Sequence, residues 1–462
     1  MSIPRVVIAA PASGHGKTSV ATGLLAALRA RGLTVSPHKI GPDYIDPGYH
    51  ALAAGRPGRN LDPWLVGEER IAALLAHGAM TPTPADVAVV EGVMGLFDGA
   101  VGHGAFASTA HVAQLIDAPI LLVVDAAAVG RSVAALVHGF ATFDPLVRIS
   151  GVIFNRVGSP RHAQILADAM AETGIPMVGA VRRQDALVTP SRHLGLIPAA
   201  ERTAEASATV EALGRVIAQS VDLDEVLAIA RSAAPLEVDR ATLGVLSRPE
   251  VARSDGAPRI AVAGGAAFTF GYAEQAELLA AHGAEVVRFD PLRDERLPER
   301  VAGLVIGGGF PETHADQLSA NAAMRTDIAA AVADGVPIAA ECAGLLYLAK
   351  SLDGQPMCGV LDVDATMTDR LTLGYREAVA VADSVLAEAG TRVRGHEFHR
   401  TECTPSSGAQ AAWQWRSGDE RIAEGAVRAG VHASYLHLHW AGDDSIPRRF
   451  VGACQAAARR RA

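Results

Sequence analysis

Two stretches of this 462-residue chain carry residues whose types and spacing are suited to chemistry, and the first is a phosphate-binding turn. "GHGKTSV", residues 14–20, follows an apolar run and leads into a stretch rich in alanine and leucine. A strand that enters a helix through a glycine-containing turn presents backbone N–H groups and the positive end of the helix dipole to an anion. In the P-loop pattern the lysine reaches the β- and γ-phosphates and the next hydroxyl binds Mg²⁺, so Lys17 and Thr18 are predicted to take these roles.

The glycines of this turn depart from the common P-loop spacing. Counting G-x-x-x-x-G-K-[ST] back from Gly16 places Pro11 at the first position. The spacing of Gly14 and Gly16 before the Lys-Thr pair instead resembles the variant loop of enzymes like dethiobiotin synthetase. A turn that only caps a helix is the alternative, but strand, turn, Lys-Thr pair and helix agree, so these residues are predicted to bind ATP.

Carboxylates and an amide are predicted near the turn. The strand "DVAVVEG" ends at Glu91, on the edge where the phosphate loop lies, so Glu91 is predicted to bind Mg²⁺ together with Thr18. The segment "HKIGPDYIDPGYH" has two prolines and two glycines, and it is expected to form a restrained loop whose acids, Asp43 and Asp46, either cap turns or contact substrate. Asn155 ends "ISGVIFN" and offers an amide able to read an adenine edge, with an ordinary strand-end residue as the alternative.

The second stretch, "VPIAAECAGLLYLA", places Cys342 between an apolar strand and a helical run. A sharp strand-to-helix turn exposes a thiol and aims a helix N-terminus at it, which is expected to lower the pKa of the thiol toward neutrality. Cys342 is therefore the predicted nucleophile, although a lone cysteine is usually inert core. The turn in "GLVIGGGFPE" supplies N–H groups for an oxyanion hole, predicted at Gly308 and Gly309, with Ala343 after the cysteine as a third predicted donor.

Two histidines are candidates for the catalytic base. In the extended segment "SYLHLHW", His437 and His439 lie two residues apart and share one strand face, and only one of them can be the primary base. The remaining cysteines lack such surroundings and are predicted to be structural: Cys358, Cys403 and Cys454.

These residues must be positioned by a parallel sheet in the first half of the chain. Apolar, β-rich runs alternate there with helical stretches, which is typical of a sheet covered by helices on both faces. The sequence predicts an α/β fold, with a three-layer P-loop domain and a mainly parallel sheet at residues 1–235. The expected helices span Ser19 to Arg31, Ser108 to Ile116, Ser132 to Phe140, Arg161 to Glu172 and, continuously, about Ala204 to Arg231.

A second α/β domain is expected after a linker. Residues 236–257 contain proline and charge without sustained periodicity, so the linker is placed there. A new alternating series begins at Arg259, and after Ala365 the pattern changes to extended runs, which predicts an antiparallel extension. The second domain is assigned to residues 258–462, with helices at Ala273 to His282, Met324 to Ala333 and near Pro447 to Ala458.

Composition excludes several classes of protein. A net charge of −9 and a pI near 6.0 argue against a general nucleic-acid binder, whose surface would have to offset phosphate charge. The four cysteines have no metal-binding spacing, which predicts a reducing, cytoplasmic location. No run approaches the ~20 apolar residues needed to cross a bilayer, so no membrane contact is expected.

The motifs together resemble the cobyrinic acid a,c-diamide synthase family, including its hydrogenobyrinic acid branch. Five motifs occur in the order of that family: "KIGPDYIDPGYH", "VVEGVMGLFDG", "AECAGLLYL", "RGHEFH" and "SYLHLHW". The resemblance covers essentially the whole chain. The resemblance implies an ATP-dependent amidoligase domain like dethiobiotin synthetase, followed by a class I glutamine amidotransferase domain. Asp46 and Asp98 match family acids at the corrin site, Asp43 and Tyr44 lie in the same loop motif, and Thr18 and Glu91 match magnesium positions.

Two departures from class I amidotransferases are visible. Their nucleophile motif usually reads G-x-C-x-G, whereas this chain has Ala340 at the first position. They usually carry H-x-E after the last strands, and here His439 stands where the orienting glutamate would be. The alignment makes His437 the expected base and His439 the reserve.

The family implies a substrate set of ATP, L-glutamine and a corrinoid polycarboxylic acid, with Mg²⁺ accompanying ATP. No nucleic acid or membrane is expected as a partner, and a homodimer is left open. Three rival functions remain: a cobyric acid synthase, an enzyme acting on nickel sirohydrochlorin, and a ParA-like nucleotide switch whose second domain only binds. The residues do not distinguish a cobalt-containing ring from a cobalt-free one.

Overall fold

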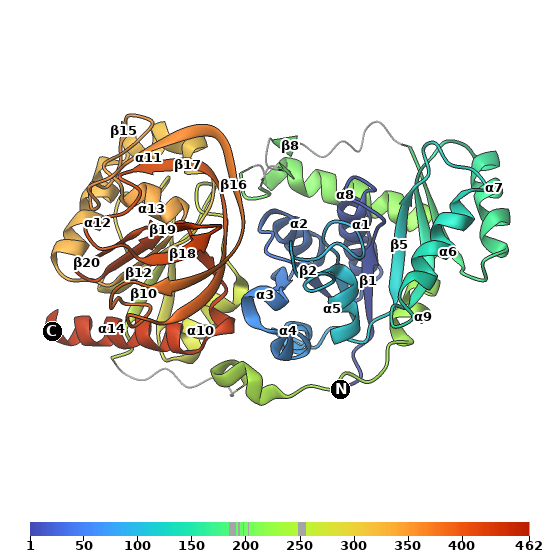
Figure 1. Ribbon diagram of the computed structural model, residues 1–462, viewed down its shortest axis with the longest axis horizontal. Coiled ribbons are helices and arrows are strands. Elements are labelled where there is room, and N and C mark those ends of the chain that lie inside the picture. Colours follow the sequence, from blue (N-terminus) through green and yellow to red (C-terminus); the bar gives the residue numbers. More distant parts are fainter. Residues whose placement is uncertain (184–190, 193–194, 197, 202, 248–255, 462) are drawn as a thin grey trace. The chain divides into compact units, whose positions relative to one another are not determined.

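The chain divides into two compact units. The first comprises Met1–Pro63 and Gly67–Thr242, and the second comprises Trp64–Val66 and Leu243–Ala462. The boundary after Thr242 falls inside the segment 236–257 predicted to be the linker, of which residues 248–255 lie outside the described residues. The computed structural model describes residues 1–183, 191–192, 195–196, 198–201, 203–247 and 256–461 (Figure 1).

A seven-stranded parallel sheet forms the centre of the first unit, as the apolar runs predict. Two of its strands, β1 (Arg5–Ala9) and β4 (Val87–Glu91), are buried along their whole length, which explains why their sequences are continuous apolar runs. In sheet order the strands are β3 (Arg59–Leu61), β2 (Val35–Ile40), β4 (Val87–Glu91), β1 (Arg5–Ala9), β5 (Ile120–Asp125), β6 (Ile149–Val157) and β7 (Met177–Arg182). Because β1, β2 and β4 are parallel neighbours, their carboxyl ends meet at one edge.

Helices connect and cover these strands. The helix after the phosphate turn, α1, packs against α2 and α8, whereas α9 packs on β1 and β4. The helices of the first unit are α1 (Lys17–Ala30), α2 (Ile45–Ala54), α4 (Glu68–Met80), α5 (Thr109–Leu115), α6 (Val133–Phe143), α7 (Pro160–Ala171), α8 (Thr203–Ser220) and α9 (Leu223–Arg231), whereas the short α3 (Pro63–Val66) belongs to the second unit from Trp64 onward. A two-stranded ribbon joins β8 (Ser191–Arg192) to β9 (Gly195–Leu196).

Two local predictions in this unit are wrong. The segment expected to be a restrained loop becomes helical from Ile45, because Pro47 lies in the first turn of α2, where a missing N–H costs nothing. The helix expected to run continuously to Arg231 is two helices, because the side chain of Asp222 caps α9 by accepting from the backbone N–H groups of Asp224 and Glu225.

The second unit is built on a six-stranded sheet (Figure 1). Its strands are parallel except at one edge, where β20 is antiparallel to β21. In sheet order they are β11 (Glu285–Phe289), β10 (Arg259–Ala263), β12 (Val301–Ile306), β13 (Ile338–Glu341), β21 (Val431–Ser434) and β20 (Ala426–Arg428). The nucleophile motif follows β13, and the histidine motif follows β21, which is the neighbour of β13.

The predicted antiparallel extension is a second sheet of this unit. Two long strands, β16 (Asp364–Ala380) and β17 (Arg392–Thr404), form its centre, and the short β22 (His437–Leu438) pairs with β17. Its other strands are β14 (Ser351–Leu352), β15 (Gln355–Pro356), β18 (Trp413–Ser417) and β19 (Glu420–Glu424). Helices of this unit are α10 (Ala273–Ala281), α11 (Ala315–Ala320), α12 (Ala322–Ala333), α13 (Ala343–Leu348) and α14 (Ser445–Arg461), with 3₁₀ turns η2 (Arg240–Ser247), η3 (Pro311–His314) and η4 (Trp440–Gly442).

Among the described residues, no helix is both long and apolar enough to cross a membrane.

Candidate active sites

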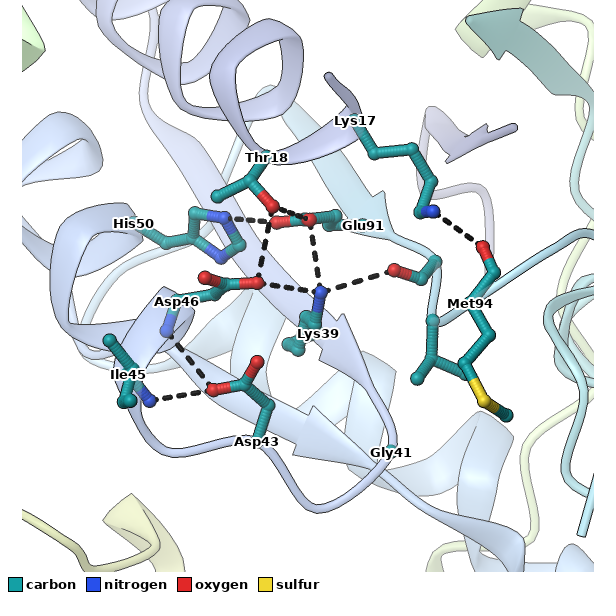
Figure 2. Close-up of polar contacts among 12 residues, drawn as sticks. Lys17, Thr18, Lys39, Gly41, Asp43, Ile45, Asp46, His50, Glu91 and Met94 are labelled. Atoms are coloured by element: carbon teal, nitrogen blue, oxygen red, sulfur yellow. Dashed lines mark hydrogen bonds and ion pairs between the residues drawn. The ribbon is translucent and has the colours of Figure 1, made fainter. Parts of the chain in front are cut away.

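The phosphate turn between β1 and α1 has a backbone that favours glycine. Gly14 and Gly16 have φ angles of 84° and 92°, in the left-handed region, and Gly16 is the N-cap of α1. A Cβ atom at Gly16 would lie 2.2 Å from Nδ2 of Asn155, so a side chain there would collide. The Nζ of Lys17 donates to the carbonyl oxygen of Met94, which brings the lysine to the segment after β4 (Figure 2).

A buried cluster of charged groups lies beside Thr18 at the carboxyl edge of the sheet. The Thr18 hydroxyl donates to Oε1 of Glu91 at 2.6 Å (Figure 2). The same Oε1 accepts from Nζ of Lys39 at 2.9 Å, and Lys39 also donates to Oδ2 of Asp46 at 2.8 Å. On the other side of the carboxylate, Nε2 of His50 lies 2.7 Å from Oε2 of Glu91. One lysine is therefore shared by two carboxylates.

Burial and charge act in opposite directions on these groups. Burial alone would raise the pKa of Glu91, but Lys39 and hydrogen bonds from His50 and Thr18 outweigh it and hold that pKa well below its usual range. Burial likewise opposes the charge on Lys39, yet Asp46 and Glu91 raise its pKa. The pKa of Asp46 is raised to about 7, mainly by burial and by the charge of Asp43. Lys39 and Glu91 thus form the charged pair, and Asp46 titrates near neutrality.

The donor set fits a magnesium ion bound together with phosphates. Mg²⁺ is held in nucleotide sites by one or two carboxylates and a hydroxyl, with the phosphates completing its coordination. Thr18 and Glu91 are in contact with each other, as that arrangement requires. Within the described ranges, no group of three or more histidine, cysteine or acidic side chains could hold a metal without such a ligand. Thr18 and Glu91 therefore fit a Mg²⁺ ion that phosphates also bind, and this site stays a prediction.

The loop acids predicted for the substrate have unequal surroundings. Asp43 Oδ1 accepts from the backbone N–H groups of Ile45 and Asp46 at 2.7 and 3.2 Å, so Asp43 caps the start of α2. Tyr44 is buried. Asp98 is exposed, and its Oδ2 accepts from Gly95 N at 2.9 Å. Contact of Asp43, Tyr44 and Asp98 with substrate stays a prediction.

Asn155 lies against the phosphate turn. Its Nδ2 donates to the carbonyl oxygen of His15 at 3.0 Å, and its Oδ1 accepts from Arg156 N at 2.9 Å. The amide therefore supports the turn that carries Gly14 and Gly16. Recognition of adenine by Asn155 stays a prediction.

Lys39 and His50 were not singled out from the sequence. Both belong to the motif "HKIGPDYIDPGYH", but Glu91, the acid that both contact, lies far outside it. The pairing of β2 with β4 places Lys39 directly opposite Glu91, 52 residues away. A buried strand that contains a lysine was the available signal, since an unpaired buried lysine is rare.

The nucleophile candidate occupies a strained turn between β13 and α13. Cys342 has φ 49°, in the left-handed region, and it is the N-cap of α13. Its backbone N–H donates to the carbonyl oxygen of Ser434 on β21 at 2.7 Å. A Cβ atom at Gly344 would lie 2.1 Å from the carbonyl oxygen of Ile306, which explains why glycine is needed two residues after the cysteine.

The predicted direction of the Cys342 pKa is wrong. Burial raises the pKa of the thiol, and the charge of Glu312 raises it further, while the N–H of Ala343 opposes them. The helix that follows is only six residues long, and one N–H group does not offset burial. The thiol is therefore protonated at neutral pH and needs a base.

The two histidines have different neighbours. The Cε1 atom of His437 lies 2.5 Å from the position that a Cβ at Gly308 would take, so its ring packs against the glycine turn after β12. Burial lowers the pKa of His437 well below its usual value, and a neutral imidazole can accept a proton. His439 instead stacks on Tyr272 at 4.2 Å, and its Nε2 lies 3.7 Å from Oε2 of Glu274. His437 as the base, with His439 as the reserve, stays a prediction.

The three predicted oxyanion donors have different surroundings, and the role of each stays a prediction. The backbone N–H of Gly308 already donates to the carbonyl oxygen of Phe270 at 3.2 Å, as part of a short antiparallel bridge. Gly309 is packed closely, since a Cβ there would lie 2.1 Å from the carbonyl oxygen of Ala267. Ala343 is the first residue of α13, where backbone N–H groups have no partner within the helix.

Comparison with known proteins identifies both halves of the chain. The CobQ/CobB/MinD/ParA nucleotide binding domain matches residues 6–197, and the CobB/CobQ-like glutamine amidotransferase domain matches residues 259–445. Hydrogenobyrinate a,c-diamide synthase of Streptomyces coelicolor is 56% identical over 99% of this chain and 98% of its own length. The protein belongs to the a,c-diamide synthase family.

Other members of the a,c-diamide synthase family cover the chain equally well. The hydrogenobyrinate enzyme of Thermobifida fusca is 54% identical over 98% of this chain and 97% of its own. The cobyrinate a,c-diamide synthase of Gloeobacter violaceus is 45% identical over 98% and 97%. These matches, with an amidotransferase model on the second half, leave no support for a ParA-like switch with a non-catalytic second domain.

The remaining cysteines of this family member are buried free thiols: Cys358, Cys403 and Cys454. Burial raises the pKa of each of them. They differ from Cys342 in position, because none lies between a strand and the first residue of a helix. A structural role for them stays the prediction.

Proposed function

We propose that this protein converts the a and c acetate side chains of hydrogenobyrinic acid to amides, using ATP and glutamine. The observation that carries the proposal is the co-occurrence in one chain of a phosphate turn with a Lys39–Glu91–Asp46 cluster and a cysteine at a strained strand–helix turn. One site prepares the acid and the other prepares the nitrogen, which is the glutamine-dependent amidation for which the relatives are named.

The first site makes the carboxylate reactive. A carboxylate is a poor electrophile, so an acetate side chain attacks the γ-phosphorus of ATP and becomes an acyl phosphate, with ADP as the leaving group. The turn at Gly14–Thr18 holds the phosphates through backbone N–H groups, and Lys17 neutralises charge on them. Thr18 and Glu91 would hold a Mg²⁺ ion, which would supply further charge neutralisation when bound. Asp46, which shares Lys39 with Glu91, is proposed to orient a substrate group.

The second site makes ammonia. His437 takes the thiol proton as Cys342 attacks the side-chain amide of glutamine, and the oxyanion is stabilised by the N–H groups of Gly309 and Ala343. The proton then passes to the leaving ammonia, and water hydrolyses the thioester to glutamate. Ammonia attacks the acyl phosphate at the first site, which forms the amide and releases phosphate.

Relatedness favours a cobalt-free ring as substrate. The relatives named for hydrogenobyrinate are 53–56% identical to this chain, whereas those named for cobyrinate are 41–45% identical. The cobyric acid synthase and nickel-sirohydrochlorin alternatives gain no support from these names. The acids of the first site would contact the periphery of the ring, so relatedness rather than site chemistry supports this choice.

The test is a side-by-side assay of the full-length enzyme. Hydrogenobyrinic acid and cobyrinic acid are each incubated with MgATP and glutamine, and ADP, glutamate and the product mass are measured. The proposal expects two successive conversions of carboxyl to amide, each with one ADP and one glutamate, and higher kcat/KM for hydrogenobyrinic acid. Equal or better turnover of cobyrinic acid would overturn the choice of ring, and no amide with either ring would overturn the function.

Assembly is a separate part of the proposal. A homodimer is compatible with both domains, and light scattering of the purified chain distinguishes it from a monomer. A molecular mass of one chain under assay conditions would exclude it.

A further inference from the structure

The residue before the nucleophile is a buried acid. Glu341 is the last residue of β13 and is only 8% exposed. The proposed mechanism assigns no role to a carboxyl group at this position. Burying an acid without compensating contacts costs free energy of folding. Glu341 is therefore expected to have a specific partner.

The partners of Glu341 lie in the segment that carries the histidines. The indole Nε1 of Trp440 donates to Oε1 of Glu341 at 3.4 Å, across 99 residues of chain. The backbone N–H of Leu438, which lies between the two histidines, also donates to the carboxyl group. Trp440 is 1% exposed, so both ends of the contact are in the core.

A second buried acid holds the beginning of the same segment. Glu424 accepts from the hydroxyl of Ser434 and, at 3.0 Å, from the backbone N–H of Tyr435. Ser434 is also the residue whose carbonyl oxygen accepts from the N–H of Cys342. Hydrogen bonds to buried acids thus hold both ends of residues 434–440, to Glu424 at the first end and to Glu341 at the last.

The charge state of Glu341 suits this role. Burial raises its pKa to about 8, against weaker lowering by the hydrogen bonds from Trp440 and Leu438. At neutral pH the side chain is a neutral acid, which accepts hydrogen bonds without placing a negative charge beside the thiol. A glutamine has the same shape and the same acceptor.

We infer that Glu341 is a positioning residue for glutamine hydrolysis, because its carboxyl group fixes the backbone between His437 and His439 relative to the strand that ends at Cys342. The inference rests on the proposed function. In H-x-E amidotransferases a carboxylate after the histidine is expected to orient it, and here histidine stands at that position. Glu341 acts on the base through the backbone of Leu438, and it reaches this backbone from the nucleophile strand.

The test compares Glu341→Met with Glu341→Gln in the full-length enzyme. Methionine keeps the volume and removes the acceptor, so kcat for glutamine hydrolysis should fall roughly 10²-fold, as expected for a misplaced catalytic group. KM for glutamine should change little, because Glu341 is assigned no contact with glutamine. Glu341→Gln keeps the acceptor oxygen, so its kcat should equal that of the wild type. Amidation with added ammonia should be unchanged in both variants.

Two further variants separate positioning from loss of stability. Trp440→Phe removes one donor, and its effect on kcat should be less than additive with Glu341→Met. Cys454→Ala alters another buried site of the same unit, and it should lower the melting temperature without lowering kcat. Full kcat in Glu341→Met, equal loss in Glu341→Gln, or an equal loss in Cys454→Ala would each overturn the inference. If the wild type neither hydrolyses glutamine nor makes amides, the proposed function fails instead.

Discussion

Replacing Lys39 by methionine tests the charged cluster at the first site most directly. The side chain of Lys39 is 5% exposed, and those of its partners Glu91 and Asp46 are 1% and 12% exposed. Methionine preserves much of the length and packing but removes the ammonium group that both acids share. Two buried carboxyl groups would then lose their shared ammonium group and keep contacts to Thr18 and His50.

The size and sign of the effect follow from burial. Removing one partner of a buried ion pair costs about 3–5 kcal/mol of unfolding free energy. In the wild type the pKa of Glu91 is below its unfolded value, so its stabilisation is present above pH 4.5 and is lost only as pH falls. Without Lys39, burial dominates and the folded pKa of Glu91 rises above its unfolded value. The variant should then lose stability as pH rises, and its deficit should be larger at pH 8 than at pH 5.

Urea denaturation followed by circular dichroism measures this difference. The transition of the nucleotide-binding unit is recognised because MgATP shifts it. Arg31→Met is the matched control, since it breaks an ion pair with Asp224 in the same unit that is 42% and 84% exposed and should cost at most about 1 kcal/mol at either pH. A Lys39→Met protein as stable as this control, or one with the same deficit at both pH values, would refute the reasoning.

Four other outcomes are expected. Cys342→Ser should abolish glutamine-dependent amidation and leave ammonia-dependent amidation, whereas loss of both would show a different role for the thiol. Lys17→Ala should lose ATP-dependent amidation and ADP release but keep glutaminase activity; unchanged synthesis would remove the phosphate role. Gly308→Ala places a Cβ atom 2.5 Å from Cε1 of His437, so overpacking should lower the free energy of unfolding by about 1–3 kcal/mol and displace the imidazole ring. Glutaminase kcat should therefore fall, with normal ammonia-dependent activity. Burial raises the pKa of Glu424 to about 8, so the folded state keeps a proton that the unfolded state loses near pH 4.5. The free energy of unfolding should therefore fall as pH rises from 4.5 to 8. In urea titrations, Glu424→Gln should make this fall with pH less steep.

Fold class and the order of the elements were predictable because both depend on local pattern. Continuous apolar runs such as Val87–Glu91 are buried strands of a parallel sheet, and the change to extended runs after Ala365 marks the antiparallel sheet. The errors occurred where one residue changes a local outcome. Asp222 caps a new helix inside a periodic stretch, and Pro47 begins a helix instead of preventing one.

The candidate sites were predictable only in part. Lys17, Thr18 and Cys342 could be proposed because strand, turn and helix are consecutive in the chain, but their burial could not be predicted in the same way: Lys17 and Cys342 are buried. Gly308 was chosen as an oxyanion donor from the same kind of motif, but its N–H is used by Phe270, 38 residues earlier. A motif indicates which groups are available, whereas a distant strand decides which of them are already bonded.

The sequence by itself determined which chemical groups this protein has and on which turns they lie: the phosphate loop at Gly14–Thr18, the cysteine after β13 and the histidines after β21. Spacing along the chain is sufficient for this, because a turn joins residues that are only a few positions apart. Tertiary structure alone decided the partners and the charges. It placed Lys39 against Glu91 through strand pairing, Glu341 against Trp440 across 99 residues, and it raised the pKa of Cys342 by burial. Each of these depends on contacts between distant segments and on the exclusion of water, and neither is present until the chain has folded.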